Sequence, residues 1–214
     1  MVKRIFWEDS YKKECISTIV SIKGNNILFD QTVAYAFSGG QISDSATING
    51  IEILSAQINE NYNIEYEVED ISQFSIGQKV TMKINWEKRY NLMKLHTAQH
   101  IVGEFIEKKQ PGIKTSGSNI RDSKATLTYV FEENINTILP EVEFEINNFL
   151  HKKFDVQTSF DKHNINRRIW KCDEFNCFCG GTHIRNTNEI GKIKLKRKNS
   201  GKNSETVEIT LESN

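Results

Sequence analysis

Two short clusters of side chains able to bind a metal ion distinguish this sequence. His96 and His100 bracket the segment His-Thr-Ala-Gln-His, and Cys179 and His183 bracket the segment Cys-Gly-Gly-Thr-His. Together the clusters offer three imidazoles and one thiolate, a donor set that suits Zn²⁺. The sequence therefore predicts a single zinc ion bound by these four residues.

Each pair reaches one ion for a different geometric reason. Residues four apart on a helix point the same way, so a helix would place the imidazoles of His96 and His100 on one face. The loop between Cys179 and His183 contains two glycines, which accept backbone angles that a helix forbids. We expect this loop to fold back, so that its thiolate and imidazole meet the same ion.

The remaining histidines and cysteines are weaker candidates. His151 and His163 have no neighbouring ligands in the sequence. Cys177 is either a competing ligand or, because alternate residues of a strand share a face, a neighbour behind the ligands. Cys172 is expected to fill apolar space.

A zinc ion with four protein ligands has two uses. Structural zinc sites are closed by four ligands, whereas catalytic sites keep one position for water or substrate. For catalysis, either the ion accepts a fifth ligand, or a residue on the glycine loop, Cys179 or His183, yields its place. The sequence leaves both alternatives open.

Composition excludes few partners. The chain has 214 residues, enough for one large domain or two small ones, and 28 basic residues balance 28 acidic residues. Charge is nevertheless uneven, because the stretch from Lys192 to Lys202 contains six basic residues and no acidic residue. Such a strip is typical of a solvated strand edge, where lysines discourage pairing with another strand.

We expect neither a signal peptide nor a membrane span in this sequence. The N-terminus has no apolar signal-peptide core, and no apolar run approaches the length of a membrane span. Four clustered cysteines are too few for a disulfide framework in a chain of this size. We expect a cytoplasmic protein with reduced thiols and no membrane partner.

The elements that must position the candidate ligands follow a β-rich first half. Alternating apolar residues over 16–22, 64–68 and 80–84 predict short strands, and Asn49-Gly50 is a strong hairpin signal. Short strands joined by tight turns favour a small barrel or sandwich.

Helical spacing begins at Asn85, a candidate N-cap, and stops at Pro111-Gly112. A second helix is predicted from about Asn136 to Lys153, and strands return over 193–195 and 207–211. We therefore predict an α+β protein: a small N-terminal β-barrel (residues 1–88), followed by an α/β sandwich with an antiparallel sheet (residues 89–214).

The two motifs, in this order, resemble the editing domain of alanyl-tRNA synthetase and the free-standing alanyl-tRNA editing proteins of the AlaX type. The resemblance covers nearly the whole chain. It includes four further segments: 7–11, 116–118, 186–191 and the glycine-rich region 32–44. Ala36 and Ser38 within the glycine-rich region, and Ala46 just after it, depart from the family pattern, whereas all four ligand positions are intact.

The resemblance implies zinc-dependent hydrolysis, in trans, of seryl- or glycyl-tRNA(Ala), which protects translation fidelity. A synthetase pocket gains only about 1–3 kcal/mol against such small differences in amino acid, so a second hydrolytic site is needed. The implied partners are the acceptor end of tRNA(Ala) and, functionally, alanyl-tRNA synthetase.

The resemblance also implies roles for individual residues. The four ligands become the catalytic centre. Substrate contacts are expected from Thr97 and from the glycine-rich region, namely Thr32, Gly39, Gly40 and Gln41. Contacts with tRNA phosphates are expected from the basic strip, namely Lys192, Lys194, Lys196 and Arg197.

Other function classes fit less well. The main alternative is a structural-zinc module that binds charged tRNA without cleaving it. A metalloprotease is disfavoured because position 97 is Thr, where His-Glu-x-x-His enzymes need Glu as the general base. A complete synthetase is disfavoured because the chain is short and contains no candidate ATP-binding domain.

Overall fold

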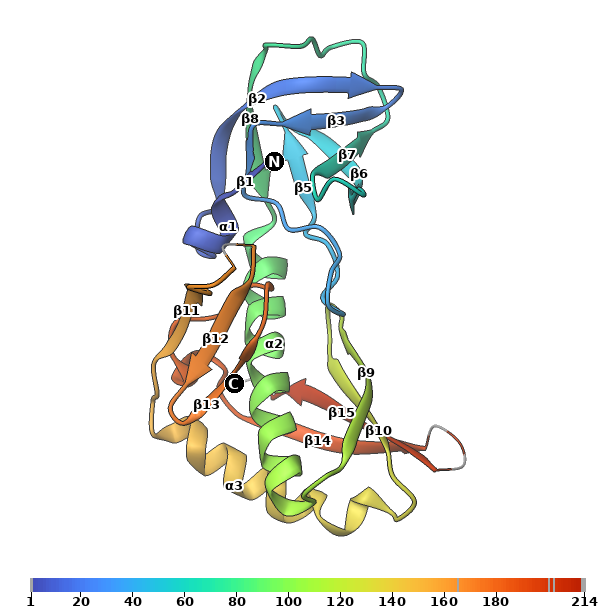
Figure 1. Ribbon diagram of the computed structural model, residues 1–214, viewed down its shortest axis with the longest axis vertical. Helices are drawn as coiled ribbons and strands as arrows, with labels where there is room; N and C mark the ends of the chain where they lie inside the picture. The colour runs from blue at the N-terminus through green and yellow to red at the C-terminus, as the bar shows by residue number, and fades with distance from the viewer. Residues whose placement is uncertain (1, 165, 200, 202, 213–214) are drawn as a thin grey trace. The chain divides into compact units, whose positions relative to one another are not determined.

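The computed structural model describes residues 2–164, 166–199, 201 and 203–212. The chain divides into two compact units, Met1–Tyr90 and Asn91–Asn214. Helix α2 (Trp86–Lys109) runs through this division, and the boundary predicted at residue 88 lies in the same helix. The α+β class is confirmed, since a closed antiparallel barrel precedes a unit that combines helices with antiparallel sheets (Figure 1).

The first unit is built around a closed barrel with the strand order β2-β3-β7-β6-β5-β8. A short helix and a parallel pair, β1 and β4, accompany it. The elements of the first unit before α2 are β1 (Lys3–Arg4), α1 (Ile5–Glu8), β2 (Glu14–Lys23), β3 (Asn26–Phe29), β4 (Gln31–Thr32), β5 (Ala46–Ile48), β6 (Ile51–Ile58), β7 (Ile64–Val68) and β8 (Lys79–Ile84).

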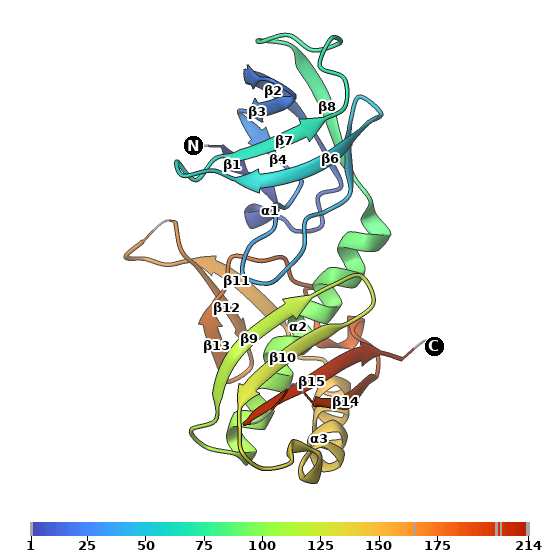
Figure 2. The ribbon, with the colours of Figure 1, turned by 90° about the vertical axis from the view of Figure 1, so that its right-hand side faces the viewer.

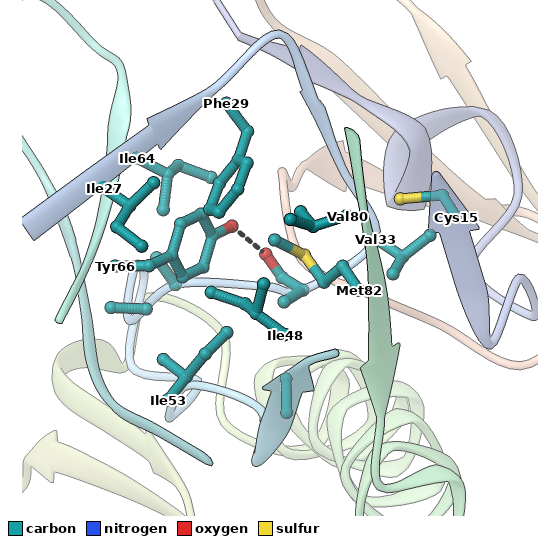
Figure 3. Close-up of a cluster of buried hydrophobic side chains, with 14 of the residues drawn as sticks. Cys15, Ile27, Phe29, Val33, Ile48, Ile53, Ile64, Tyr66, Val80 and Met82 are labelled. Carbon is teal, nitrogen blue, oxygen red and sulfur yellow. Dashed lines mark hydrogen bonds between the residues drawn. The ribbon is translucent and has the colours of Figure 1, made fainter. Parts of the chain in front are cut away.

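Alternating side chains fill the barrel, as the period of the strands predicts. Ile27, Phe29, Tyr66 and Met82 are almost completely buried and converge in the core (Figure 3). The predicted hairpin at Asn49-Gly50 is confirmed, with both residues at positive φ, 51° and 88°, between β5 and β6. This turn needs the left-handed conformations that Asn and Gly tolerate best.

A buried ion pair ties the start of α2 to the first unit. The guanidinium of Arg89 donates to both carboxylate oxygens of Asp44, and neither side chain is exposed. Arg89 also donates to the carbonyls of Ser10 (3.0 Å) and Val33 (2.7 Å). Asp44 accepts a further bond from the backbone of Tyr35. Every charge that Arg89 and Asp44 bring inside is thus hydrogen-bonded, as burial requires.

The second unit contains two antiparallel sheets. One has the strand order β14-β15-β10-β9, and the other has the order β11-β12-β13 (Figure 2). Its further elements are β9 (Lys114–Ile120), β10 (Ala125–Val130), η1 (Ile135–Thr137), α3 (Leu139–His151), β11 (Val156–Phe160), β12 (Arg168–Cys172), β13 (Phe175–Phe178), η2 (Thr187–Glu189), β14 (Ile193–Asn199) and β15 (Ser204–Leu211).

Helix α2 contacts both sheets of the second unit. The predicted N-cap is confirmed, because the Asn85 side chain accepts a bond from the Lys88 backbone at 3.0 Å. On one side, the Gln99 amide donates to carbonyls of β9 and β10, at Asn119 and Thr126. On the other side, the ring of His100 stacks on Trp170 of β12. The helix therefore holds its two histidines in a fixed orientation between the sheets.

Helix α3 is shorter than the sequence predicts. It begins at Leu139, not near Asn136, because residues 135–137 form a separate 3₁₀ turn capped by the side chain of Asn134. Side chains of α3 cover the outer edge of β14. Asn147 bonds both backbone polar groups of Ile193, and Glu143 accepts from the backbone of Leu195.

None of the helices in the described ranges is long and apolar enough to cross a membrane.

Candidate metal centre

The four predicted ligands converge in the second unit. Within the described part of the chain, one donor atom from each of His96, His100, Cys179 and His183 lies within 4.8 Å of all the others. The histidines of α2 share a helix face, with ring centroids 4.9 Å apart. The glycine loop after β13 brings the other two ligands to that face, and the centroid of His183 lies 4.3 Å from that of His96. The structure thus brings together ligands from two distant segments.

The distances around Cys179 fit an ion with tetrahedral coordination. Its Sγ lies 3.4 Å from Nε2 of His96 and 3.2 Å from Nε2 of His183. Standard Zn–S and Zn–N bond lengths at a tetrahedral angle would separate such atoms by about 3.5 Å. In addition, within the described residues, the buried Nε2 of His100 has no hydrogen-bond partner. An atom of this kind is expected to have a partner, and a metal ion would supply one.

Burial keeps the three imidazoles neutral. It lowers the pKa of His96 and of His183 well below the usual value, and the neighbouring histidines lower both further. The pKa of His100 falls to about 4 for the same reason. A neutral imidazole has a lone pair free for a metal, so the chain presents its histidines in the protonation state that binds.

Unlike the imidazoles, the thiol of Cys179 is in a protonation state that does not bind a metal. Burial raises its pKa to about 11, although a bond from the Gly181 backbone to the sulfur partly opposes this shift. The thiolate is the form that binds metal, so an incoming ion must displace this proton.

Thr97 has a specific contact within the centre. Its side chain is fully buried, and its hydroxyl lies 3.1 Å from Nδ1 of His183. If the hydroxyl accepts the Nδ1 proton, Nε2 of His183 is left free for the ion. The contact with substrate expected of Thr97 stays a prediction.

Cys172 and Cys177 have different surroundings. Cys172 is fully buried and pairs with Val156 and Phe175 across its strands, which confirms it as a small apolar residue. Cys177 lies beside the ligands, with its Sγ 3.5 Å from Nδ1 of His100. Burial raises the pKa of Cys177 to about 12, so it remains a thiol at neutral pH.

Two residues near the centre were not predicted from the sequence. Trp170 is fully buried, and its ring stacks on His100 at a centroid distance of 4.8 Å. Arg168 has its guanidinium 4.3 Å above the ring of Phe160, and its carbonyl accepts a bond from the backbone of Cys179. The alternation of residues 168–172, which form β12, was the available signal for both.

The glycine-rich region belongs to the first unit. Gly39 and Gly40 both have positive φ in a tight turn, and the backbones of Ser38 and Gln41 bond across it. The Gln41 side chain is buried. Thr32 lies in the barrel core, where its hydroxyl is 2.6 Å from that of Tyr66, the bond dashed in Figure 3. Substrate contacts by this region stay predictions.

The predicted basic strip lies largely on β14. Lys194 forms an ion pair with Glu143 of α3, and Arg197 forms one with Glu205 of β15. Lys192 and Lys196 are exposed. Lys202, the end of the strip, lies outside the described residues.

Comparison with known proteins gives consistent matches. Residues 168–207 match the family model described as the Threonyl and Alanyl tRNA synthetase second additional domain. The chain is 32% identical to the alanyl-tRNA editing protein AlaX-M of Pyrococcus horikoshii, and the match covers 99% of both chains. The AlaX-M protein of Saccharolobus solfataricus is 28% identical with the same coverage. The alanine–tRNA ligase of Methanococcus aeolicus is 30% identical over 89% of this chain, which spans 23% of that longer protein.

Proposed function

Because the chain belongs to the AlaX family of alanyl-tRNA editing proteins, we propose that it hydrolyses the ester joining a wrong amino acid to tRNA(Ala). The proposed targets are seryl- and glycyl-tRNA(Ala), which the protein would hydrolyse in trans, outside the synthetase. The observation that carries this proposal is the convergence of His96, His100, Cys179 and His183 around one point. Three imidazoles and one thiol in a partly buried cluster suit Zn²⁺.

A zinc ion held there would polarise the ester carbonyl or activate a water molecule. The chain itself contributes preorganisation. The two histidines of α2 are fixed on a rigid helix, and Thr97 holds the ring of His183 by its Nδ1 atom. The burial of His96 and His183 excludes bulk water, which strengthens electrostatic interactions inside the centre.

The glycine loop is the part of the centre best able to adjust to substrate. Cys179 and His183 lie outside regular strands and helices, whereas His96 and His100 lie within α2. We therefore assign any exchange of ligands during the reaction to Cys179 or His183. For the tRNA, we propose phosphate contacts by the exposed Lys192 and Lys196, with the glycine-rich region near Gln41 contacting the aminoacyl end.

A closed structural zinc site is the second candidate function. It is favoured by the number of protein donors, since four ligands complete a structural site. In that case the protein would bind charged tRNA without cleaving it.

The deciding experiment is deacylation of seryl-, glycyl- and alanyl-tRNA(Ala) by wild type and by His100→Ala, with zinc content measured on the same samples. Cys172→Ala is the matched control, because Cys172 is a buried cysteine of β12 that is not part of the four-residue cluster. The proposal expects wild type and control to cleave the first two substrates and spare the third, while His100→Ala loses both zinc and activity. A wild type that holds one zinc and cleaves none of the three would establish the structural-zinc alternative.

A further inference from the structure

The Nδ1 atom of His100 has a specific neighbour outside the four-residue cluster. Nδ1 of His100 lies 3.5 Å from Sγ of Cys177, whereas the buried Nε2 of the same ring has no partner among the described residues. His183 shows the same division, with Nδ1 on Thr97 and Nε2 toward Cys179. In both rings, therefore, Nδ1 contacts a side chain that is not one of the four cluster residues, and Nε2 is not engaged by that side chain.

This division determines which nitrogen can bind a metal. A neutral imidazole carries its proton on one nitrogen and keeps a lone pair on the other. If Nδ1–H of His100 donates to the sulfur of Cys177, the lone pair remains on Nε2. Partners of this kind fix the tautomer and orientation of metal-binding histidines.

The surroundings of Cys177 keep its sulfur at this position. Cys177 lies on β13 directly opposite Trp170 of β12, and the Trp170 ring stacks on His100 at 27° between planes. The imidazole is thus held by Trp170 on its face and by Cys177 at its edge. Cys177 is not part of the four-donor cluster, and it meets His100 at Nδ1.

We propose that Cys177 is a positioning residue of the metal centre, whose sulfur accepts the Nδ1 proton of His100 and so directs Nε2 to the ion. This inference rests on the metal centre of the proposed function. It assigns to Cys177 the role that Thr97 has toward His183, and it separates two cysteines that stand only two residues apart. Cys179 is a ligand, and Cys177 orients one.

Zinc affinity tests this assignment, measured by competition with a chelator on Cys177→Ala, Cys177→Ser and the control Cys172→Ala. Loss of such a partner typically weakens metal binding about 10- to 100-fold, which is the effect expected for Cys177→Ala. Cys177→Ser should recover most of the affinity, because a hydroxyl also accepts the proton. Cys172→Ala should bind as wild type.

Cobalt substitution separates positioning from ligation. Co²⁺ bound through sulfur has a thiolate charge-transfer absorption, which we expect to keep its intensity in both Cys177 variants and to vanish in Cys179→Ser. An intensity that halves in Cys177→Ser would make Cys177 a ligand and overturn the proposal. Unchanged zinc affinity in Cys177→Ala would also overturn it.

Failure of the proposed function gives a different result. If wild type binds zinc and Cys177→Ala weakens it, while no mischarged tRNA is cleaved, the positioning role stands and the hydrolase does not. If wild type binds no metal, the metal centre fails, and the role of Cys177 fails with it.

Discussion

The ionisation of Cys179 and its histidine partners sets how a metal ion enters the centre. Burial keeps the imidazoles neutral at pH 7 and raises the pKa of the Cys179 thiol to about 11. Only the thiol must therefore lose a proton, and we expect about one proton released for each zinc bound near pH 7. Calorimetry in two buffers of different ionisation enthalpy measures this number. Release near zero would mean that the thiolate exists before binding, and release near four would mean that the three imidazoles are charged as well.

Arg89 gives a second prediction for a single residue. Removing one member of a buried ion pair leaves the other charge uncompensated, so Arg89→Ala should lower the free energy of unfolding by about 3–5 kcal/mol. Urea denaturation measures the loss. The control is Lys3→Ala, because Lys3 and Glu8 form an ion pair at 3.3 Å with both side chains about half exposed. Its removal should cost under about 1 kcal/mol. Equal losses in the two variants would show that burial does not strengthen the role of Arg89.

The sequence predicted the four residues that converge in the cluster, but not the contacts that orient them. The spacing of His96, His100, Cys179 and His183 predicted one site, because these residue types have few other reasons to recur together. Trp170 and Thr97 are different, since their residue types fit many environments. The register of β12 against β13 places Trp170 beside the imidazoles, and the packing of α2 places Thr97 there.

Among the elements, β14 carries the most exposed basic charge of the proposed tRNA surface. Of the four basic residues expected to contact tRNA, Lys194 and Arg197 are engaged with carboxylates, whereas Lys192 and Lys196 are exposed. Replacing both by Ala should reduce the slope of log affinity for tRNA against log salt by about 2, or about 1 per phosphate contact. Lys171→Ala, an exposed position on β12, is the control and should leave the slope unchanged. If the double variant keeps the wild-type slope, Lys192 and Lys196 do not contact tRNA phosphates, and the proposal for this surface is wrong.

Elements with a strong apolar period could be predicted, and polar strands could not. Barrel strands such as β7 and β8 follow their period closely, with buried residues at alternate positions. In β11, only Val156 is buried and the other residues are exposed, so no alternation exists to detect. In β9 the burial pattern is equally weak, and Gly117 interrupts a polar run. Pairing with neighbouring strands decides these segments, and a single sequence carries little of that information.

For the whole molecule, the three histidines of the cluster make stability depend on pH when no metal is bound. Their pKa values are lower in the folded chain than the usual 6.5, so the unfolded chain binds more protons as the pH falls. Stability is therefore retained above about pH 6.5 and lost progressively as the pH falls toward 4. Urea denaturation of the metal-free protein across this range measures the loss. His100→Gln should lose less stability over the same interval, and an identical pH profile would contradict the assignment to His100.

The continuity of helix α2 also limits where the gene for this protein can recombine with others. Arg89 anchors its first turn within one unit, and His96 and His100 supply ligands within the other, on a single unbroken helix. A recombination point between the units would cut that helix. The Methanococcus aeolicus ligase matches 89% of this chain inside a far longer protein. Recombination between genes is thus expected to transfer the coding region for both units together, and not for either unit alone.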